Sequence, residues 1–494
     1  MTVTSLLFFL STLAAALVYH KLPQKYRNAW LLLVSAGFVA TWSWQFVLVL
    51  ALFAVVNYAI GLKMERVPAQ MLAWSYAGIL FNLLFLFLLK YNDFYLPAFS
   101  GLLAKVHLVN AGETAKILVP VGLSFLMVQA VSYLLDLRNK RLPAETDFVK
   151  FGLYIFYFPK LLSGPIERAR TFLPKLDNPL LVETPLVERS LALILTGLFR
   201  KLAFADPLFN LIPADAFTKP LTYPGQNLLF WLLAYSFALY NDFAGYTSIV
   251  RGVSLWFGIE LSPNFNLPYL SRNFSEFWSR WHISLSNWLR DYIFFPFARA
   301  IAKRGTKYSR LFNLILPPLV TMLVSGLWHG LAWSLLFWGA LHGIYQIVER
   351  IPSLWAKVTP LNERPKWRQY LGTATTFIFA ALAWIPFHAT LPQSWQFLQG
   401  LFLWRKPEFF LLRSTLTGKL QFTSWNTYLL PNPFLVALII LAICFDWLQL
   451  RGKREEFILN WHRLALIVFV VLLLLLAVLS AFSDQITPFV YQAF

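Results

Sequence analysis

The chain has 494 residues, of which 58% are hydrophobic, 18% aromatic and only 13% charged. Soluble proteins carry about 25% charged residues, so these charges are too few to cover the surface of a soluble protein of this length. The 47 phenylalanines and 20 tryptophans exclude a disordered chain, and the single cysteine, Cys444, excludes a disulfide scaffold. We therefore expect an all-α polytopic membrane protein.

The charge balance is strongly basic, with 42 Lys and Arg against 23 Asp and Glu and a net charge of +19. Such an excess suggests either nucleic-acid binding or the enrichment of basic residues in cytoplasmic loops beside anionic headgroups. No basic run is interleaved with a soluble RNA- or DNA-binding module. The second interpretation is favoured, with membrane lipid and not nucleic acid as the partner.

Apolar runs long enough to cross a bilayer core of about 30 Å begin at the start of the chain. The first run carries its positive charges after the apolar stretch, at Lys21, Lys25 and Arg27, which predicts a retained span with the N-terminus outside. The first five expected spans are 2–19, two within 28–62 with a turn near Ser43, 71–89 and 116–136. The basic loops expected on the cytoplasmic side are 20–28, 63–68 and 138–150.

Later runs bring the total to about 13 candidate spans, several of which could be half-spans. They are 188–205, 226–241, 244–258, 311–327, 330–348, 370–387, 434–449 and 464–482. Gly164-Pro165 and Pro317-Pro318 interrupt the pattern, and broken helices at membrane depth need protein or water around them. We expect re-entrant segments around an interior cavity, within one domain over 1–494. No inverted repeat is visible, which disfavours a secondary transporter.

His329 stands out among the seven histidines. It lies in Ser-Gly-Leu-Trp-His-Gly, and no Asp, Glu, Lys or Arg occurs from Leu311 to Val348. The residue is either at a turn between two spans or on a broken helix inside the membrane. An ionisable group inside a membrane is a functional-site hypothesis, whereas an imidazole at a turn could simply bond a backbone carbonyl. Residue chemistry alone leaves the two possibilities equal.

His282 lies in a segment, 273–292, whose aromatic residues recur at three- and four-residue spacing. Asn273 and Glu276 resemble a capping box, and Glu276 with Arg280 forms an i,i+4 pair. The segment predicts one amphipathic helix, which could lie at the membrane interface or line a cavity with Arg280 and His282 facing inward.

Several common catalytic signatures are absent from the sequence. There is no GxSxG, no P-loop, no HExxH and no His/Cys cluster that predicts a metal site. The remaining pair, His282 and His329, has no acidic neighbour in the pattern of the soluble glycerolipid acyltransferases. Such a pair suits a neutral general base or an acyl relay better than ion transport.

Phe274-Ser-Glu-Phe-Trp-Ser-Arg-Trp-His282 followed by Ser325-Gly-Leu-Trp-His329-Gly resembles the membrane-bound O-acyltransferases. The resemblance extends in order from about residue 20 to 390. It is strongest to the bacterial alginate O-acetyltransferase branch, and the teichoic-acid D-alanylation branch is related. Further segments that carry it are Pro120-Val-Gly-Leu-Ser124, Phe158-Pro-Lys-Leu-Leu-Ser-Gly164-Pro165, Lys201-Leu-Ala-Phe-Ala-Asp206, Tyr240-Asn-Asp242-Phe-Ala-Gly-Tyr246 and Trp338-Gly-Ala-Leu-His342.

The resemblance implies a ring of about eleven transmembrane helices around a central funnel, with the catalytic core in 266–348. It implies that His329 is the catalytic residue and that His282 lies near it. The acyl group would come from a cytoplasmic thioester, acetyl-CoA or an acyl-carrier phosphopantetheine, and no bound cofactor is implied. A neutral imidazole could deprotonate a hydroxyl that attacks the thioester or could carry the acyl group itself.

We name further candidates around this core. The tunnel-lining candidates are Trp328, Trp281, Arg280, Asn287, Asp242, Asp206 and Tyr246. A basic stretch follows, from which Lys303, Arg304 and Lys307 are candidates for contact with the phosphates of coenzyme A or with an acidic acyl-carrier protein. The same stretch could instead be an ordinary cytoplasmic loop.

The chain departs from the alginate branch at two places. Asp242-Phe-Ala-Gly-Tyr-Thr-Ser248 replaces the usual Asp-Phe-Ser-Gly-Tyr-Ser-Asp, and Phe387-His388 replaces the usual Phe-Arg. These changes put the acceptor and the partner surface in doubt.

No segment resembles an extracytoplasmic GDS-type acyltransferase, which implies a separate partner of that kind. We expect a multi-pass protein of the bacterial inner membrane that passes an acyl group, acetyl in the first hypothesis, toward an exported polysaccharide. D-alanyl transfer toward teichoic acid is the alternative, and a transporter or flippase is the alternative of another class.

Overall fold

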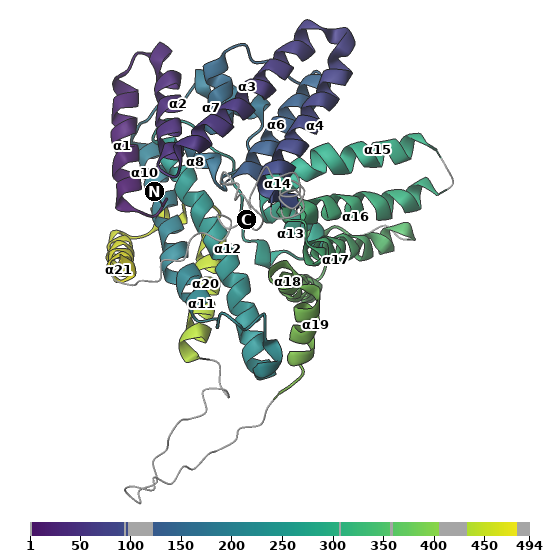
Figure 1. Ribbon diagram of the computed structural model, residues 1–494. Coiled ribbons are helices and arrows are strands. Elements are labelled where there is room, and N and C mark those ends of the chain that lie inside the picture. Colours follow the sequence, from purple (N-terminus) through teal and green to yellow (C-terminus); the bar gives the residue numbers. More distant parts are fainter. Residues whose placement is uncertain are drawn as a thin grey trace, which may run out of the picture. The chain divides into compact units, whose positions relative to one another are not determined.

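Every regular element that the structure describes is helical, as the composition predicted. The computed structural model (Figure 1) describes residues 2–92, 95–96, 122–305, 308–355, 359–404 and 432–481. Lys307 and the beginning of the expected span 116–136 lie outside these residues. Two compact units divide the chain: residues up to Ile194 with Tyr246–Asn264 form the first, and Leu195–Gly245 with the residues from Phe265 onward form the second.

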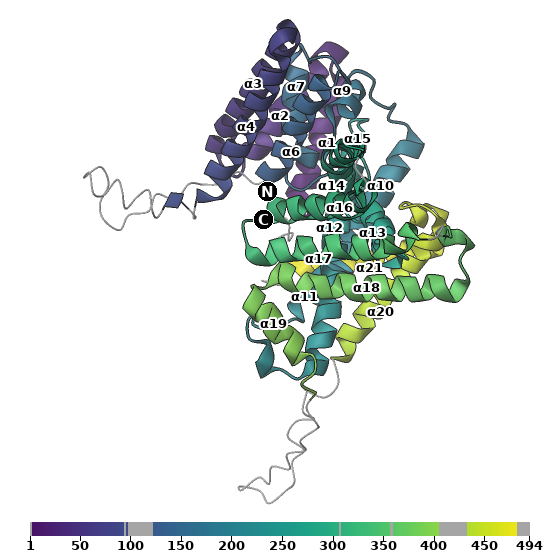
Figure 2. The same ribbon diagram turned by 90° about the vertical axis from the view of Figure 1, so that its right-hand side faces the viewer.

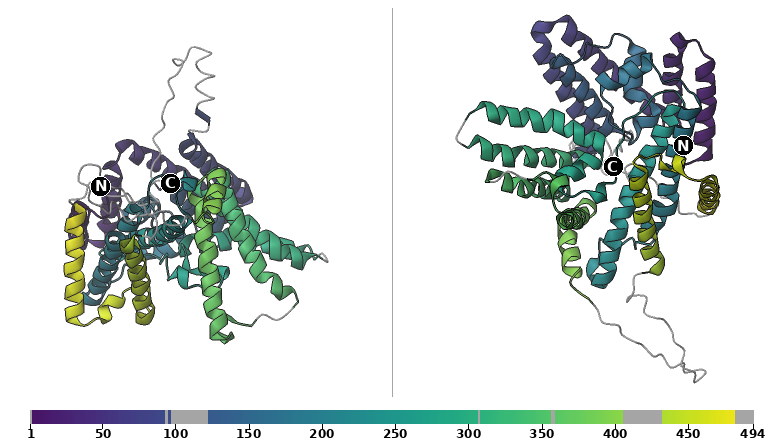
Figure 3. Two further views of the ribbon diagram at one scale, coloured as in Figure 1. Left: turned by 90° about the horizontal axis from the view of Figure 1, so that it is seen from below. Right: turned by 180° about the vertical axis from the view of Figure 1, so that it is seen from behind.

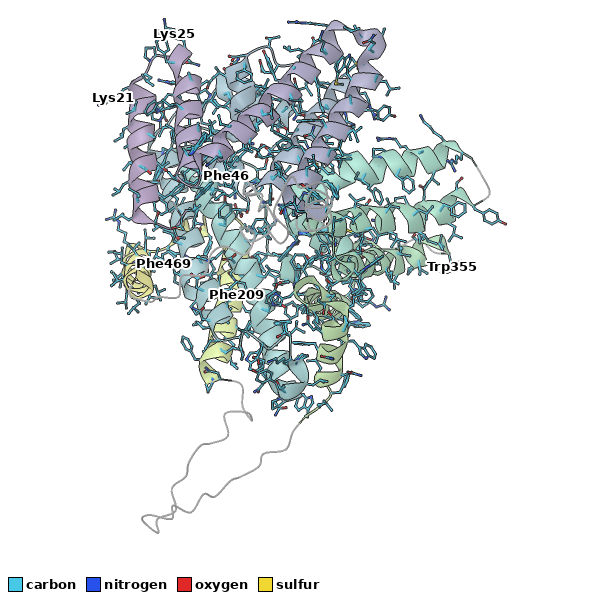
Figure 4. All side chains as sticks on the ribbon, viewed as in Figure 1. Lys21, Lys25, Phe46, Phe209, Trp355 and Phe469 are labelled. Carbon is cyan, nitrogen blue, oxygen red and sulfur yellow. The ribbon has the colours of Figure 1, made fainter. Side chains whose placement is uncertain are left out.

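The first unit begins with three helices, α1, α2 and α3, that are joined by short turns. The turn expected near Ser43 is present, since α2 ends at Ala40 and α3 begins at Trp44. Lys21 and Lys25 lie at the turn between α1 and α2, as the basic loop 20–28 predicted (Figure 4). The helices of this unit are α1 Leu6–Lys21, α2 Gln24–Ala40, α3 Trp44–Arg66, α4 Met71–Lys90, α6 Leu123–Arg138, α7 Phe148–Phe156, α8 Phe158–Leu161 and α9 Ala169–Asp177.

Two long helices, α10 Thr184–Phe199 and α12 Gly225–Leu255, pass from one unit into the other. The prediction of two spans at 226–241 and 244–258 is therefore wrong, because α12 is continuous. The polar pair between the two expected spans does not break the helix. The Asn241 side chain donates to the Phe237 carbonyl at 2.9 Å, and the Asp242 carboxylate pairs with Lys201 at 2.7 Å.

The second unit contains the segment 266–348. Its helices are η2 Arg200–Ala205, a π-helical continuation of α10, then α11 Asp206–Asn210, α13 Phe274–Arg280, α14 Ile283–Leu289, the π-helical η5 Arg290–Phe294, α15 Phe295–Lys303, α16 Ser309–His329, α17 Trp333–Arg350, α18 Lys366–His388, α19 Leu391–Gly400, α20 Pro433–Gly452 and α21 Arg463–Ala481. Helices α16, α17 and α18 lie side by side (Figures 2 and 3).

Pro317 and Pro318 do not interrupt α16, although the sequence suggested a break there. The helix continues through both prolines to His329, and the Thr321 hydroxyl donates to the Pro317 carbonyl at 2.6 Å. Each proline removes the backbone donor that would bond the carbonyl four residues earlier, Asn313 for Pro317 and Leu314 for Pro318, and the helix continues without these two hydrogen bonds. Gly164-Pro165, in contrast, lies in a buried stretch without regular structure.

Five described helices are long and apolar enough to cross a membrane. They are Trp44–Arg66, Pro68–Lys90, Ser309–His329, Lys366–His388 and Pro433–Gly452, with shorter apolar helices at Leu6–Lys21 and Arg463–Leu479. The protein is thus a helical membrane protein. The larger number of spans expected from the sequence stays a prediction.

Candidate active site

Helices α16 and α17 pack closely enough that only glycine fits at their contact. A Cβ atom on Gly326 would lie 2.4 Å from the Leu335 carbonyl oxygen, and one on Gly339 would lie 2.3 Å from the Met322 carbonyl oxygen. Small residues let helix backbones approach where apolar burial alone does not drive association. This close approach sets the positions of the side chains on both helices, His329 among them.

His329 is the last residue of α16, and α17 begins after a short turn at Trp333. Of the two possibilities from the sequence, the structure has the turn. The imidazole is 5% exposed and lies among three aromatic rings. Its centroid is 4.8 Å from Trp328, 5.2 Å from Trp338 and 5.0 Å from Phe387, each nearly perpendicular to it. His329 is therefore held in an apolar, aromatic environment.

His282 interrupts the helix that the periodicity predicted over 273–292. The backbone at His282 has φ 41° and ψ 54°, the left-handed region, and separates α13 from α14. The prediction of one continuous helix is wrong, because periodicity reports which side chains share a face and not where the backbone turns. Non-glycine residues in this conformation are costly and occur most often at functional sites.

The break at His282 is held by hydrogen bonds on both sides. The Trp281 amide donates to the Phe277 carbonyl at 2.7 Å, and the Ser286 hydroxyl donates to the Trp281 carbonyl at 2.9 Å. The Arg280 carbonyl accepts from the Asn266 amide at 3.0 Å. These contacts fix the imidazole in place.

The His282 ring is 1% exposed and contacts Phe243, with centroids 4.8 Å apart. Burial lowers the pKa of His282 to about 3, so its imidazole is neutral at physiological pH. Phe243 belongs to the segment Asp242–Ser248 that departs from the alginate-branch pattern.

Trp328 joins the two histidines. Its ring contacts His329 and also His282, at 6.0 Å between centroids. The structure thus brings His282, Trp328 and His329 together, in agreement with the expectation that His282 lies near His329. Two buried imidazoles beside one indole form a site that can accept and return a proton in a water-poor setting.

The second unit also contains a cavity of about 290 Å³, which His282, Trp328 and His329 do not line. Its lining comes from α13, α14, η5, α15, α16 and α17 and combines polar with aromatic side chains. Asn287 and Trp278 line it, together with the guanidinium groups of Arg290 and Arg350. The Arg350 guanidinium lies 5.2 Å from the Phe294 ring centroid. The Arg290 guanidinium also bonds the Asp291 carboxylate at 3.2 Å, and with Arg350 it gives the cavity a basic side that suits an anionic ligand.

The other tunnel-lining candidates make contacts of their own. Arg280 bonds Glu276 at 2.6 Å, and Trp281 packs on Trp384 with centroids 4.9 Å apart. Asp206 and Asp242 meet at Lys201, with ion pairs of 2.8 and 2.7 Å. This pairing compensates the burial of both carboxylates, and their place in a tunnel stays a prediction.

Tyr246 is buried in the first unit, where its hydroxyl accepts from the Ser163 amide at 3.3 Å. The donor-contact candidates Lys303 and Arg304 are exposed at the end of α15, and Lys307 lies outside the described residues. Their proposed contact with the donor stays a prediction.

Sequence reasoning assigned no role to three buried rings in this region: Trp278, Trp338 and His342. The i,i+4 spacing of Trp338 and His342 on one helix was the available signal. No pattern in the sequence relates Trp278 to them, because it comes from another helix. Phe387, noted only as a departure, contacts His329.

Comparison with known proteins identifies the family. Residues 29–387 match the membrane-bound O-acyltransferase family. The chain belongs to this family. It is an acyltransferase and a multi-pass membrane protein.

Relatives of the chain carry the names of O-acetylating and D-alanylating enzymes. The chain is 33% identical to the Azotobacter vinelandii protein named "probable alginate O-acetylase AlgI" over 78% of this chain and 74% of that protein. It is 31% identical to the peptidoglycan O-acetyltransferase of Helicobacter pylori, over 78% and 75% of the two chains. Identity to the teichoic acid D-alanyltransferase of Bacillus subtilis is 30%, over 54% of this chain and 69% of that protein.

Proposed function

We propose that this acyltransferase takes an acetyl group from a cytoplasmic thioester and passes it across the bacterial inner membrane toward an exported polysaccharide. The observation that carries the proposal is the buried placement of His282 and His329 on one indole, Trp328. A ring of about eleven spans around a funnel belongs to the same proposal.

The proposed reaction needs one base and one protected thioester. The neutral imidazole of His329 takes the proton of an acceptor hydroxyl as that oxygen attacks the thioester carbonyl. The C–S bond then breaks, and the departing thiolate takes the proton back from the imidazolium. Direct attack by the imidazole, giving an acyl-imidazole, is the covalent variant of the same transfer. Exclusion of water by the aromatic side chains around His329 would limit hydrolysis.

His282 supports this chemistry as a second neutral imidazole. Because burial keeps it uncharged, it adds no positive charge that would raise the acidity of His329. We propose a separate extracytoplasmic GDS-type acyltransferase as the partner that completes transfer to the polymer. The alginate and peptidoglycan relatives support an exported glycan as the acceptor.

D-alanyl transfer from a carrier protein is the second candidate, and the identity to the teichoic acid D-alanyltransferase favours it. Both donors share a phosphopantetheine arm and differ in the acyl group and in what holds the arm. The cavity with Arg290 and Arg350 is compatible with the phosphate of either donor.

One assay separates the two candidates. Purified protein in vesicles is supplied with acetyl-CoA or with carrier-bound D-alanine, and release of the free thiol is followed. We expect acetyl-CoA to be cleaved at least tenfold faster. Faster cleavage of the D-alanyl carrier would select the second candidate, and cleavage of neither would contradict the proposed function.

A further inference from the structure

His342 lies on α17, the helix that packs against the helix of His329. Its side chain is fully buried, and neither ring nitrogen has a hydrogen-bond partner among the described residues. The indole N–H groups of Trp278 and Trp338 also lack a partner within the described part of the chain. All three rings touch: His342 lies 5.0 Å from each indole, and the two indoles are 5.9 Å apart. We call them the Trp278–Trp338–His342 cluster.

Buried polar groups without partners are rare in native proteins, because burial removes the hydrogen bonds that water would supply. In this cluster, hydrogen-bond donors outnumber acceptors. Each indole is a donor only, and a neutral imidazole has one donor and one acceptor nitrogen. Three donors therefore face one acceptor, and the missing partners are oxygen atoms such as those of carbonyl groups.

The cluster lies between the cavity and His329. Trp278 lines the cavity of about 290 Å³ that also holds Arg290 and Arg350. At the other side, Trp338 contacts the His329 ring with centroids 5.2 Å apart. A ligand with an anionic end in the cavity and a reactive carbonyl at His329 would pass this cluster.

We propose that the Trp278–Trp338–His342 cluster donates hydrogen bonds to the carbonyl oxygens of the donor's arm and so places the thioester at His329. The inference rests on the proposed function and deepens it by assigning these residues to the amide-bearing arm of a pantetheine thioester. The arm offers amide and thioester carbonyl oxygens that can accept hydrogen bonds from these donors. Ordered water filling the cluster is the competing account.

The test compares two donors of different length, of which only acetyl-CoA carries the anionic nucleotide end. Acetyl-CoA has two amides, whereas the acetyl thioester of N-acetylcysteamine keeps one. Trp278→Phe and Trp338→Phe retain the ring and remove the N–H, and His342→Phe removes both nitrogens. Trp384→Phe is the matched control, because the buried Trp384 indole donates to the Tyr269 hydroxyl at 3.2 Å.

Removing one hydrogen bond to the longer arm should lower kcat/KM for acetyl-CoA about fivefold, mainly through KM. We expect at least one of Trp278→Phe and His342→Phe to show this loss while kcat/KM for the short thioester stays within twofold. His342→Gln, which restores a donor, should recover part of it. Trp384→Phe should change both donors by the same factor.

Equal losses on both donors, or unchanged kinetics in all three variants, would overturn the inference in favour of bound water. If Trp278→Phe does not fold, Trp338→Phe carries the comparison. Wild-type protein that cleaves neither thioester would instead contradict the proposed function itself, so the two failures are distinguishable.

Discussion

The second unit buries charges around Lys201 and imidazoles around His329, and the two regions differ in how their polar atoms are paired. Lys201 bonds both Asp206 and Asp242, and Arg200 bonds Asp446 at 2.7 Å. Around His329 the neighbours are aromatic rings, and Trp338 and His342 keep polar atoms without partners among the described residues.

This difference in pairing indicates that the Lys201 region stabilises the fold and that the His329 region serves the reaction. A buried charge without an opposite charge destabilises the fold, and Lys201 has its opposite charges in Asp206 and Asp242. Helix packing and a left-handed backbone hold the region of His282, Trp328 and His329 in shape. The neighbouring Trp278–Trp338–His342 cluster has hydrogen-bond donors that lack acceptors among the described residues. Substitutions in the first region should act on folding, and those in the second on transfer.

The largest expected effect is on transfer. His329→Ala removes the proposed base and should reduce acyl transfer about 10²–10⁴-fold, the usual contribution of general base catalysis. Thermal stability in detergent should change little. The control is His462→Ala, at an exposed histidine before α21. Full transfer by His329→Ala in vesicles would refute the assignment.

At the buried ion pairs we expect a loss of stability with little change in transfer. Asp242→Ala removes one of two carboxylates that pair with the buried Lys201 and should lower the free energy of unfolding by about 3 kcal/mol. Chemical denaturation in detergent measures this loss, and activity per folded molecule should persist.

Glu260→Gln is the control for Asp242→Ala. It breaks the partly exposed Arg189–Glu260 pair, which should change the free energy of unfolding by about 0–1 kcal/mol. A similar small change for Asp242→Ala would show that the buried pairing does not support the fold.

A smaller loss of stability, together with a loss of transfer, is expected at the contact of α16 and α17. Gly339→Ala places a Cβ against the Met322 carbonyl, forces α16 and α17 apart, and should cost about 1–3 kcal/mol. Transfer should fall as well, since the same contact positions His329. Gly37→Ala, in a helix with nothing near the new atom, should be neutral or stabilising. If Gly339→Ala retains normal stability and transfer, the close packing is not required.

The last effect concerns pH and is at most about 1.4 kcal/mol for each pH unit. The pKa of His282 is about 3 when folded, against about 6.5 in the unfolded chain. Between these values the unfolded state binds a proton that the folded state does not, so the free energy of unfolding falls as pH is lowered. His282→Asn should flatten this slope in denaturation curves recorded from pH 7 to 4, and an unchanged slope would place the titration elsewhere.

The sequence predicted what depends on local composition. The charge-free stretch from Leu311 to Val348 predicted α16 and α17, and His329 at their turn was one of two stated possibilities. Resemblance named the family that comparison then confirmed.

Features that depend on distant contacts were not predictable. Nothing near His282 in sequence reports its left-handed backbone, which is fixed by bonds from Asn266 and Ser286. Asp242 was a tunnel candidate because its pairing with Lys201 joins two separate helices. Trp278 meets His342 only because α13 and α17 pack together.

The most direct test of the account is transfer across a sealed membrane. Inside-out vesicles containing the purified protein and an enclosed glycan acceptor, with its partner acyltransferase, receive labelled acetyl-CoA on the outside only. The account predicts label on the enclosed glycan with wild-type protein and about a hundredfold less with His329→Gln. Equal labelling by His329→Gln would contradict the central claim that His329 passes the acyl group.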